Sequence, residues 1–266
     1  MSAQIGGAGV GCHDRAVLLK ACVNGPRRPA EHPALPITPG ELAADVAAVT
    51  RAGVGAVHLH VKDAAGVDTF AAAELSAVLE AVRGAAPALP VGVTTGAWAL
   101  PDPGDRVLAV QSWMALPDFA SVNWHEDGAD QVAEALLAHG VGVEVGLWHT
   151  DAVEAWLASP HRDRCLRVLI ELPDGLDDAE TQAEAARLLK LVSTSVDGHP
   201  GAQLPVLLHG QGSSCWPALE TAARLRLDTR IGLEDTLELP DGSPAADNAA
   251  LVATAQQVIA TAMTAR

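Results

Sequence analysis

The chain has 266 residues, of which 49% are hydrophobic, so it is long enough to bury a large core. Its formal net charge of −16 argues against nucleic acid or an anionic membrane surface as a partner, because both attract basic faces. The four cysteines form no CxxC pair, and no apolar run reaches the roughly 18 residues of a membrane span, so we expect reduced thiols in a cytoplasmic protein.

Short β-rich runs alternate along the chain with longer Ala- and Leu-rich helical patterns. The first strand is predicted over residues 17–23, and the next helix opens at Thr38-Pro39-Gly40-Glu41, a capping box with proline in its first turn. The following units pair strands 56–61, 90–94 and 119–122 with helices 71–85, 103–114 and 129–139. The last four pair strands 141–145, 165–171, 205–208 and 229–233 with helices 151–159, 177–196, 216–225 and 247–261.

Eight consecutive βα units predict a parallel sheet that closes into a single (β/α)8 TIM barrel domain over residues 1–266. An open doubly wound sheet is the alternative, but no GxGxxG turn follows the first strand. Residues 1–15 are expected to form a flexible or peripheral segment. They lack the basic start and apolar run of a signal peptide.

Polar residues stand where each predicted strand ends. In a barrel of this class the reaction site lies at the carboxyl ends of the strands, so these residue types indicate its chemistry. Buried carboxylates are costly unless they are paired or bind a metal, and several of them together suggest a cation. The residues at these ends are Asn24, His58, His60, Thr94, Thr95, Asn123, Glu144, Glu171, His209, Glu234 and Asp235.

The clearest metal motif is Val57-His58-Leu59-His60, because residues two apart on a strand point to the same face. Two imidazoles and one carboxylate form a catalytic zinc set, and Glu234 at the end of the last strand supplies the carboxylate once the barrel closes. Histidine pairs of this kind also occur as packed or surface residues, so the pair alone is a weak signal.

A second cluster of charged residues lies on the last strand. Arg230 shares strand parity with Glu234, and Asp235 sits at the turn that follows. Asp235 is the best candidate for a general base, with Arg230 to orient it, although the same residues fit a surface ion pair. Thr94 and Thr95 can offer a hydroxyl near the metal or simply form a turn.

Three features are less specific. Arg27 can meet an anionic substrate or the phosphates of CoA, or it can be solvated. The glycines of loop 209–214 let backbone amides approach an anion, yet they also fit a plain loop. Trp124 and Trp148 lie just past strand ends and are expected to wall the pocket.

Several segments together resemble the β-keto acid cleavage enzyme family, from residue 18 to about residue 249. They are LKACVNGPR, HPALPITPGELA, GAVHLHVKD, PVGVTTGAW, PDFASVN, GVGVEVGLW and RIGLEDTLELPDG. The resemblance implies a zinc-dependent barrel that condenses a β-keto acid with acetyl-CoA and releases acetoacetate and a new acyl-CoA.

The resemblance also implies roles for individual residues. The positions that match the family's metal ligands are His58, His60 and Glu234. Those that match the base and its partner are Asp235 and Arg230. It places a Thr94 hydroxyl near the substrate, and Asn123 and Glu144 in the pocket wall. Positions at the strand ends add Asn24, Arg27 and Thr95 as candidate substrate-binding residues.

Two departures from the family pattern bear on the substrate. Lys62 stands where members often carry the arginine of HxHxR, so the charge is kept but the planar fork is lost. Arg27 stands where the member with an amine substrate carries an acid, so we expect a substrate with a neutral or anionic tail. The resemblance also suggests a homo-oligomer, namely a tetramer.

Two other classes of function stay open at this point. One is a metal-dependent barrel lyase, aldolase or hydrolase that acts without CoA. An amidohydrolase usually carries HxH on its first strand and histidines on strands five and six, whereas these strands here end in Glu144 and Glu171. The other is a catalytically silent relative that binds a metabolite, which need not keep the histidine pair, Glu234 and Asp235.

Overall fold

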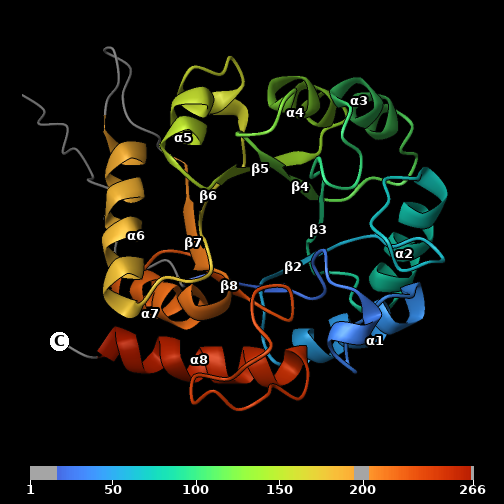
Figure 1. Ribbon diagram of the computed structural model, residues 1–266. Helices are drawn as coiled ribbons and strands as arrows, with labels where there is room; N and C mark the ends of the chain where they lie inside the picture. The colour runs from blue at the N-terminus through green and yellow to red at the C-terminus, as the bar shows by residue number, and fades with distance from the viewer. Residues whose placement is uncertain (1–16, 195–203, 265–266) are drawn as a thin grey trace, which may run out of the picture.

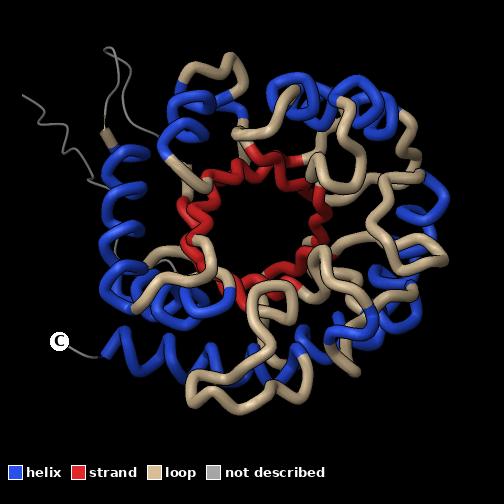
Figure 2. Tube along the Cα trace, viewed as in Figure 1, coloured by secondary structure: helices blue, strands red, loops and turns tan. Residues whose placement is uncertain are grey.

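The computed structural model describes residues 17–194 and 204–264 and arranges them as a ring of parallel strands surrounded by helices (Figures 1 and 2). Strand and helix alternate around the ring, so the predicted (β/α)8 barrel is confirmed. The predicted peripheral segment, residues 1–15, lies outside the described residues.

The bounds of the elements follow the predicted order closely. The strands are β1 (Leu19–Cys22), β2 (Ala56–Leu59), β3 (Val91–Thr94), β4 (Phe119–Asn123), β5 (Gly142–Leu147), β6 (Arg167–Leu172), β7 (Val206–Gly210) and β8 (Thr229–Ile231). The helices are α1 (Pro39–Arg51), α2 (Ala72–Ala85), α3 (Pro103–Gln111), α4 (Ala129–Ala138), α5 (Thr150–Leu157), α6 (Asp178–Ser193), α7 (Cys215–Leu225) and α8 (Asn248–Thr264). Short 3-10 turns lie at Pro29–Glu31, Arg162–Arg164 and Gly212–Ser214.

Side-chain hydrogen bonds account for two element boundaries. The predicted capping box opens α1, where the Thr38 side chain accepts from Glu41 N. The second strand ends at Leu59, earlier than predicted, because His60 N donates to the side chain of Asn24 at 2.8 Å instead of extending the ladder. The predicted helix 177–196 is α6, and residues 195 and 196 lie outside the described residues.

The strands form a complete ring, in which β1 lies between β2 and β8 and the last contact is made between β7 and β8. Neighbouring strands follow chain order from β7 back to β1, and β8 pairs with β1 in parallel, with Lys20 opposite Arg230. Between β7 and β8, Leu208 N donates to Asp228 O at 2.9 Å and Asp228 N donates to Val206 O at 3.1 Å. The ends of β2 and β8 therefore flank the end of β1.

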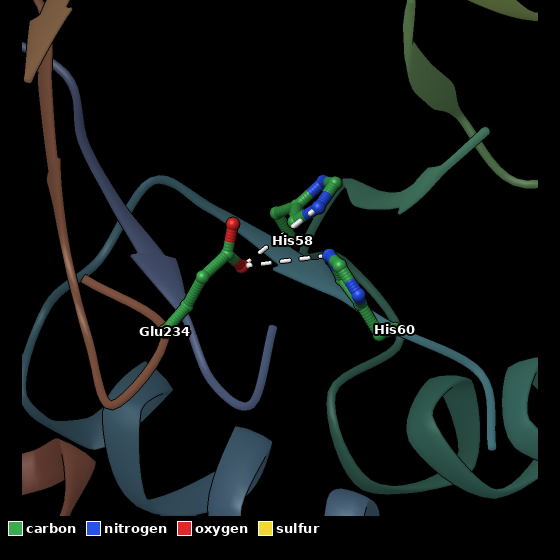
Figure 3. A group of neighbouring side chains, drawn as sticks. All are labelled: His58, His60 and Glu234. Atoms are coloured by element: carbon green, nitrogen blue, oxygen red, sulfur yellow. Dashed lines mark ion pairs between the residues drawn. The ribbon is translucent and has the colours of Figure 1, made fainter. Parts of the chain in front are cut away.

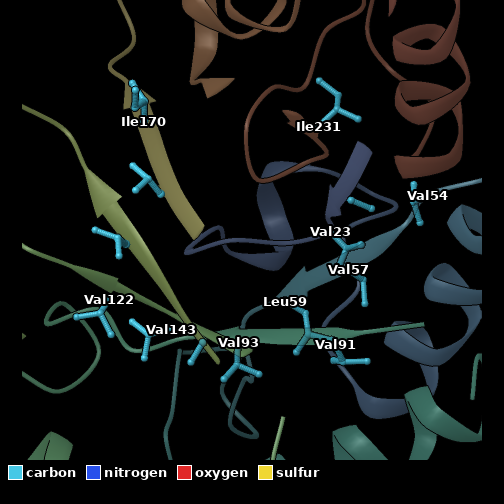
Figure 4. Packing of buried hydrophobic residues seen from close by; sticks show 14 of the residues in the cluster. Val23, Val54, Val57, Leu59, Val91, Val93, Val122, Val143, Ile170 and Ile231 are labelled. Carbon is cyan, nitrogen blue, oxygen red and sulfur yellow. The ribbon is translucent and has the colours of Figure 1, made fainter. Parts of the chain in front are cut away.

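The apolar core lies between the strands and the helices rather than inside the ring. Alternate strand residues such as Val57, Leu59, Val93 and Ile170 point outward and are buried in this layer (Figure 4). Because side chains alternate across a strand, the remaining strand residues point into the ring. The outward layer holds the barrel together and leaves the inner face for polar groups.

Charged side chains occupy part of the interior of the ring. Lys20 Nζ lies 2.6 Å from Glu144 Oε2, and Arg167 Nε lies 3.1 Å from Glu144 Oε1. Both cations also face the ring of Phe119, at 5.5 and 5.9 Å from its centroid. A Cβ on Gly92 would lie 1.9 Å from that ring, so glycine is needed there to seat the aromatic side chain.

Two expectations drawn from composition can be compared with the structure. No helix in residues 17–194 or 204–264 is both long and apolar enough to cross a bilayer. Cys22, Cys165 and Cys215 are buried and free, as expected for reduced thiols. Cys12 lies outside the described residues.

We expect Glu144→Gln to lower the free energy of unfolding by about 3–5 kcal/mol, because breaking a buried ion pair leaves the Lys20 charge uncompensated. Urea unfolding followed by circular dichroism measures the change. The exposed Glu154 on α5 gives a matched control, and Glu154→Gln should change the same free energy by less than about 0.5 kcal/mol. A loss below about 1 kcal/mol for Glu144→Gln would contradict a charged interior network.

Candidate metal and substrate site

Two histidines and a glutamate from opposite ends of the sequence converge at the carboxyl end of the ring (Figure 3). His58 lies on β2, His60 follows it directly, and Glu234 lies in the turn after β8. Glu234 Oε2 is 3.9 Å from Nε2 of each imidazole, and the three candidate ligand atoms all lie within 4.8 Å of one another. The pairing of β1 with both β2 and β8 brings the glutamate beside the histidine pair.

The donor chemistry of these three side chains fits a divalent metal. Two imidazole nitrogens and a carboxylate oxygen are donors that zinc takes, and these three atoms lie within 4.8 Å of one another, so the three side chains would hold one ion between them. Among the described residues, Glu234 Oε2 is buried without a hydrogen-bond donor. Burial, together with the nearby His60 and Lys20, lowers the pKa of His58 well below its usual value, so this imidazole is neutral as metal binding requires.

A carboxylate behind the second imidazole fixes its orientation. His60 Nδ1 lies 2.9 Å from Asp68 Oδ2, and Lys62 Nζ lies 2.5 Å from Asp68 Oδ1. Burial would raise the pKa of Asp68, but hydrogen bonds from His60, Lys62 and Trp98 hold it at about 2. The carboxylate is therefore ionised, and Nε2 of His60 is left to face Glu234.

Arg230 joins Glu234 to a second carboxylate, Asp235. Its Nη2 lies 2.9 Å from Glu234 Oε1 and 2.8 Å from Asp235 Oδ1, and its Nε lies 3.1 Å from the same Asp235 oxygen. Burial raises the pKa of Asp235 to about 7 against the opposing charge of Arg230. Asp235 Oδ2 accepts no hydrogen bond from the described part of the chain. A carboxylate in this state can accept a proton near neutral pH.

A cavity of about 330 Å³ borders these groups and is large enough for a small organic acid. The predicted site residues that line it are His58, His60, Thr94, Asn123, Arg230 and Glu234. Trp148 and Glu171, noted at strand ends, line it too. The lining residues that the sequence analysis missed are Pro26, Trp98, Ser121, His125, Glu126 and Gln211.

Five predicted site residues do not line this cavity. The Asn24 side chain binds the backbone of His60 twice. Its Nδ2 donates to His60 O, and its Oδ1 accepts from His60 N. The Arg27 guanidinium donates to the carbonyls of Leu233 and Glu234.

The other three lie behind the wall or deeper in the ring. The Thr95 hydroxyl donates to Ser121 O at 2.7 Å. Asp235 is fully buried behind Arg230. Glu144 was placed at a strand end by the sequence, but β5 runs on to Leu147, so this carboxylate lies within the strand and pairs with Lys20.

Glu126 is the most connected residue that the sequence analysis missed. Its Oε2 lies 2.8 Å from Arg106 Nη1 and accepts from Ala97 N at 2.9 Å, and its Oε1 accepts from Asn123 Nδ2 at 2.9 Å. Trp148 Nε1 donates to Asn123 Oδ1 at 3.3 Å. The sequence held one signal for this residue. Glu126 follows Asn123, the polar end of β4, by three residues, and a turn of that length can bring the two side chains together at the cavity.

The loop of residues 209–214 is not an anion cradle, so that interpretation is wrong. Gly212 N donates to Asp235 O at 2.8 Å, Ser213 N donates to the Asp174 side chain at 2.8 Å, and Gln211 N donates to a carbonyl of β6. With these amides already in use, the loop supports the backbone of Asp235. Trp124, expected in the pocket wall, packs in the apolar core instead.

Comparison with known proteins identifies one family. The family model described as beta-keto acid cleavage enzyme matches residues 16–265, nearly the whole chain. No curated protein shows a significant sequence match to the chain.

Several solved structures share the fold. ObcA in a ternary complex with a C4-CoA adduct and oxalate is 19% identical, with 86% of this chain and 64% of that chain covered at a TM-score of 0.64. ObcA with oxaloacetate is also 19% identical, with 85% and 63% covered at a TM-score of 0.59. A carboxyl transferase domain of Rhizobium etli pyruvate carboxylase with pyruvate is 11% identical, with 94% and 48% covered at a TM-score of 0.56. The chain thus spans less than two thirds of the ObcA chains, and the likeness at these identities concerns the fold alone.

We expect the purified protein to bind about one zinc ion per chain, and His58→Ala and Glu234→Gln each to abolish most of this binding by removing one of three ligands. Elemental analysis by mass spectrometry after dialysis measures the metal content. His139→Ala, which removes a histidine at the end of α4, is the matched control and should keep the metal. Equal zinc content in the parent and in His58→Ala would show that the metal lies elsewhere.

Proposed function

Because this chain belongs to the beta-keto acid cleavage enzyme family, we propose that it condenses a β-keto acid with acetyl-CoA and releases acetoacetate and a new acyl-CoA. The family gives the reaction class, the cleavage of a β-keto acid. The observation that carries the proposal is the convergence of His58, His60 and Glu234 beside Arg230 at the edge of the cavity, with Asp235 buried directly behind Arg230. It supplies a metal donor set and a base within one small volume.

The proposed metal is zinc, held by His58, His60 and Glu234. Bound there, zinc supplies Lewis-acid polarisation of the keto and carboxylate groups, which acidifies the carbon between them. Arg230 contacts Glu234 through Oε1, whereas Oε2 faces the two imidazoles. The guanidinium can thus orient the ligand without competing for the oxygen that binds the metal.

Asp235 is the proposed base, with Arg230 to orient it. Its carboxylate lies behind Arg230 rather than in the cavity wall, so we propose that it takes the proton from the carbon between the keto and carboxylate groups through one water molecule. The freed electron pair forms a bond to the acetyl carbon of acetyl-CoA as the CoA thiolate leaves. That thiolate then attacks the original keto carbon, whose bond to the central carbon breaks. Protonation of the central carbon by Asp235 yields acetoacetate, and the other product is the new acyl-CoA.

Two polar residues of the cavity wall are proposed to hold the substrate. Thr94 Oγ1 accepts from Gly96 N at 3.1 Å, so its own hydrogen remains to donate to a substrate oxygen. Asn123 is held on two sides by Glu126 and Trp148, which fixes the direction of its amide at the cavity. Both side chains are therefore prepared before a substrate arrives.

The sequence favours a substrate whose tail is either neutral or anionic. Of these two, we propose the neutral tail. Arg230 is the only Lys or Arg among the described residues that line the cavity, and it is engaged by two carboxylates. An anionic tail would find no other cation there. Glu126 is already bound by Arg106. Glu171 Oε2 lies 3.1 Å from His209 Nε2 and 3.9 Å from Arg230 Nη2, so both of these wall carboxylates have partners before an ammonium tail arrives. Trp98 and Trp148 add apolar surface to the wall.

The reaction is tested by incubating the zinc-loaded protein with a panel of β-keto acids and acetyl-CoA and measuring acetoacetate and acyl-CoA by mass spectrometry. We expect both products only when both substrates are present. Product formation from the keto acid without acetyl-CoA would indicate a lyase or hydrolase instead. No product with any keto acid would contradict the proposed function.

Asp235→Asn tests the role of Asp235 as the base. It should bind zinc like the parent, because it leaves the three ligands in place, and lower kcat by about 10²–10⁴-fold. Glu80→Gln, at an exposed position on α2, is the matched control and should keep the parent rate. Activity of Asp235→Asn within about threefold of the parent would remove Asp235 from the mechanism.

The tail is tested with three β-keto acids of equal length that end in a methyl, a carboxylate or an ammonium group. We expect kcat/KM for the methyl compound to exceed the others by at least about tenfold, because each charged tail would lose solvation without gaining a partner. Steady-state kinetics with saturating acetyl-CoA gives the ratio. A preference for either charged tail would contradict the neutral assignment.

A further inference from the structure

One carboxylate oxygen connects a proposed metal ligand to the wall of the cavity. Asp68 Oδ2 lies 2.9 Å from His60 Nδ1 and accepts from Trp98 Nε1 at 2.8 Å. We infer that Asp68, held in place by Lys62, is a positioning residue that sets the metal affinity of His60 and fixes Trp98 over the cavity. This inference rests on the proposed metal centre and adds Asp68, which lies outside the segments that carry the family resemblance.

The contact with His60 decides which imidazole nitrogen can bind a metal. Asp68 accepts from Trp98 and pairs with Lys62, so it serves as an acceptor toward His60 as well, and the tautomer that satisfies this contact carries its proton on Nδ1 and its lone pair on Nε2. Nε2 is the atom that lies 3.9 Å from Glu234 Oε2. Carboxylates placed in this way orient the ring and increase its basicity, and their loss typically weakens metal binding by about 10–100-fold.

The contact with Trp98 holds a large aromatic side chain at the mouth of the cavity. The indole is 51% exposed, yet its N–H is bound to Asp68 and its ring stacks on His60, with centroids 5.8 Å apart and planes at 17°. A Cβ on Gly96 would lie 2.0 Å from the indole, so the backbone beneath is kept clear for it. The position of the indole is therefore fixed by three neighbours, and Trp98 forms part of the cavity wall.

Lys62 completes the arrangement from the buried side. Its ammonium lies 2.5 Å from Asp68 Oδ1 and donates to Gly25 O at 2.6 Å and to Arg27 O at 3.0 Å. The ammonium thus donates two hydrogen bonds to backbone carbonyls and forms an ion pair with Asp68, all around one nitrogen, which suits an ammonium group better than a planar guanidinium. Lys62 and Asp68 also face each other across an antiparallel bridge, so the pair is fixed by the backbone as well. This explains why lysine serves at this position without facing the substrate.

The affinity for zinc tests the inference without any measurement of activity. Asp68→Asn keeps the shape of the side chain but removes its charge, and we expect zinc affinity to fall by about 10–100-fold in competition with a chromophoric chelator. Glu80→Gln is the matched control and should bind zinc like the parent. Lys62→Met leaves Asp68 in place and should weaken binding less than Asp68→Asn does.

Tryptophan fluorescence tests the second contact. Cobalt, which can replace zinc and quenches nearby indoles, should quench the parent. Trp98→Phe should remove most of that quenching while leaving zinc affinity within about threefold, because the bond between Asp68 and His60 remains. In Asp68→Asn, saturating cobalt should quench less than in the parent, because Trp98 is no longer held against His60.

The outcomes separate the inference from the proposed function. Unchanged zinc affinity in a folded Asp68→Asn protein, or an equal loss in Glu80→Gln, would overturn the role of Asp68 while the metal centre stands. Failure of the parent itself to bind zinc would overturn both. Circular dichroism melting of each variant shows that the comparison is made between folded proteins.

Discussion

Charge that is buried inside the ring must be neutralised where it lies, and this constraint organises the interior from end to end. Lys20 and Arg167 share Glu144, Arg230 shares Glu234 and Asp235, and Lys62 meets Asp68. Glu234 Oε2 and Asp235 Oδ2 accept no hydrogen bond among the described residues, and Glu234 Oε2 faces two imidazoles instead of a donor. A buried acceptor without a donor is costly, so this oxygen suits a bound cation.

The order of the strands in the barrel brings the candidate metal ligands together. Because β8 pairs with β1 and β1 pairs with β2, a carboxylate near residue 234 meets imidazoles near residue 58. Two asparagine side chains connect the ends of β1, β2 and β8. Asn24 binds the backbone of His60, and Asn248 accepts from Leu233 N at 2.8 Å while donating to Val23 O at 2.8 Å. Strand ends that are held in this way keep the proposed ligands in place.

The sequence predicts the barrel because alternation of strands and helices is a pattern of whole segments, which a shift of two residues does not destroy. It also brings His58 and His60 together, since their spacing on one strand fixes a common face. It misses Asp68, Trp98 and Glu126, whose positions depend on loop paths that no periodicity describes. It misplaces Glu144 because β5 continues past the expected end, and Arg27 because its guanidinium turns toward backbone carbonyls.

The buried ammonium of Lys20 has an electrostatic consequence for the whole interior. It lies on the strand between the two that carry the proposed ligands, and its field helps to lower the pKa of both His58 and His209. Glu144 neutralises the ammonium at 2.6 Å, yet the ammonium still disfavours a proton on either imidazole. Lys20 thereby helps to keep the lone pairs of both rings available for another partner.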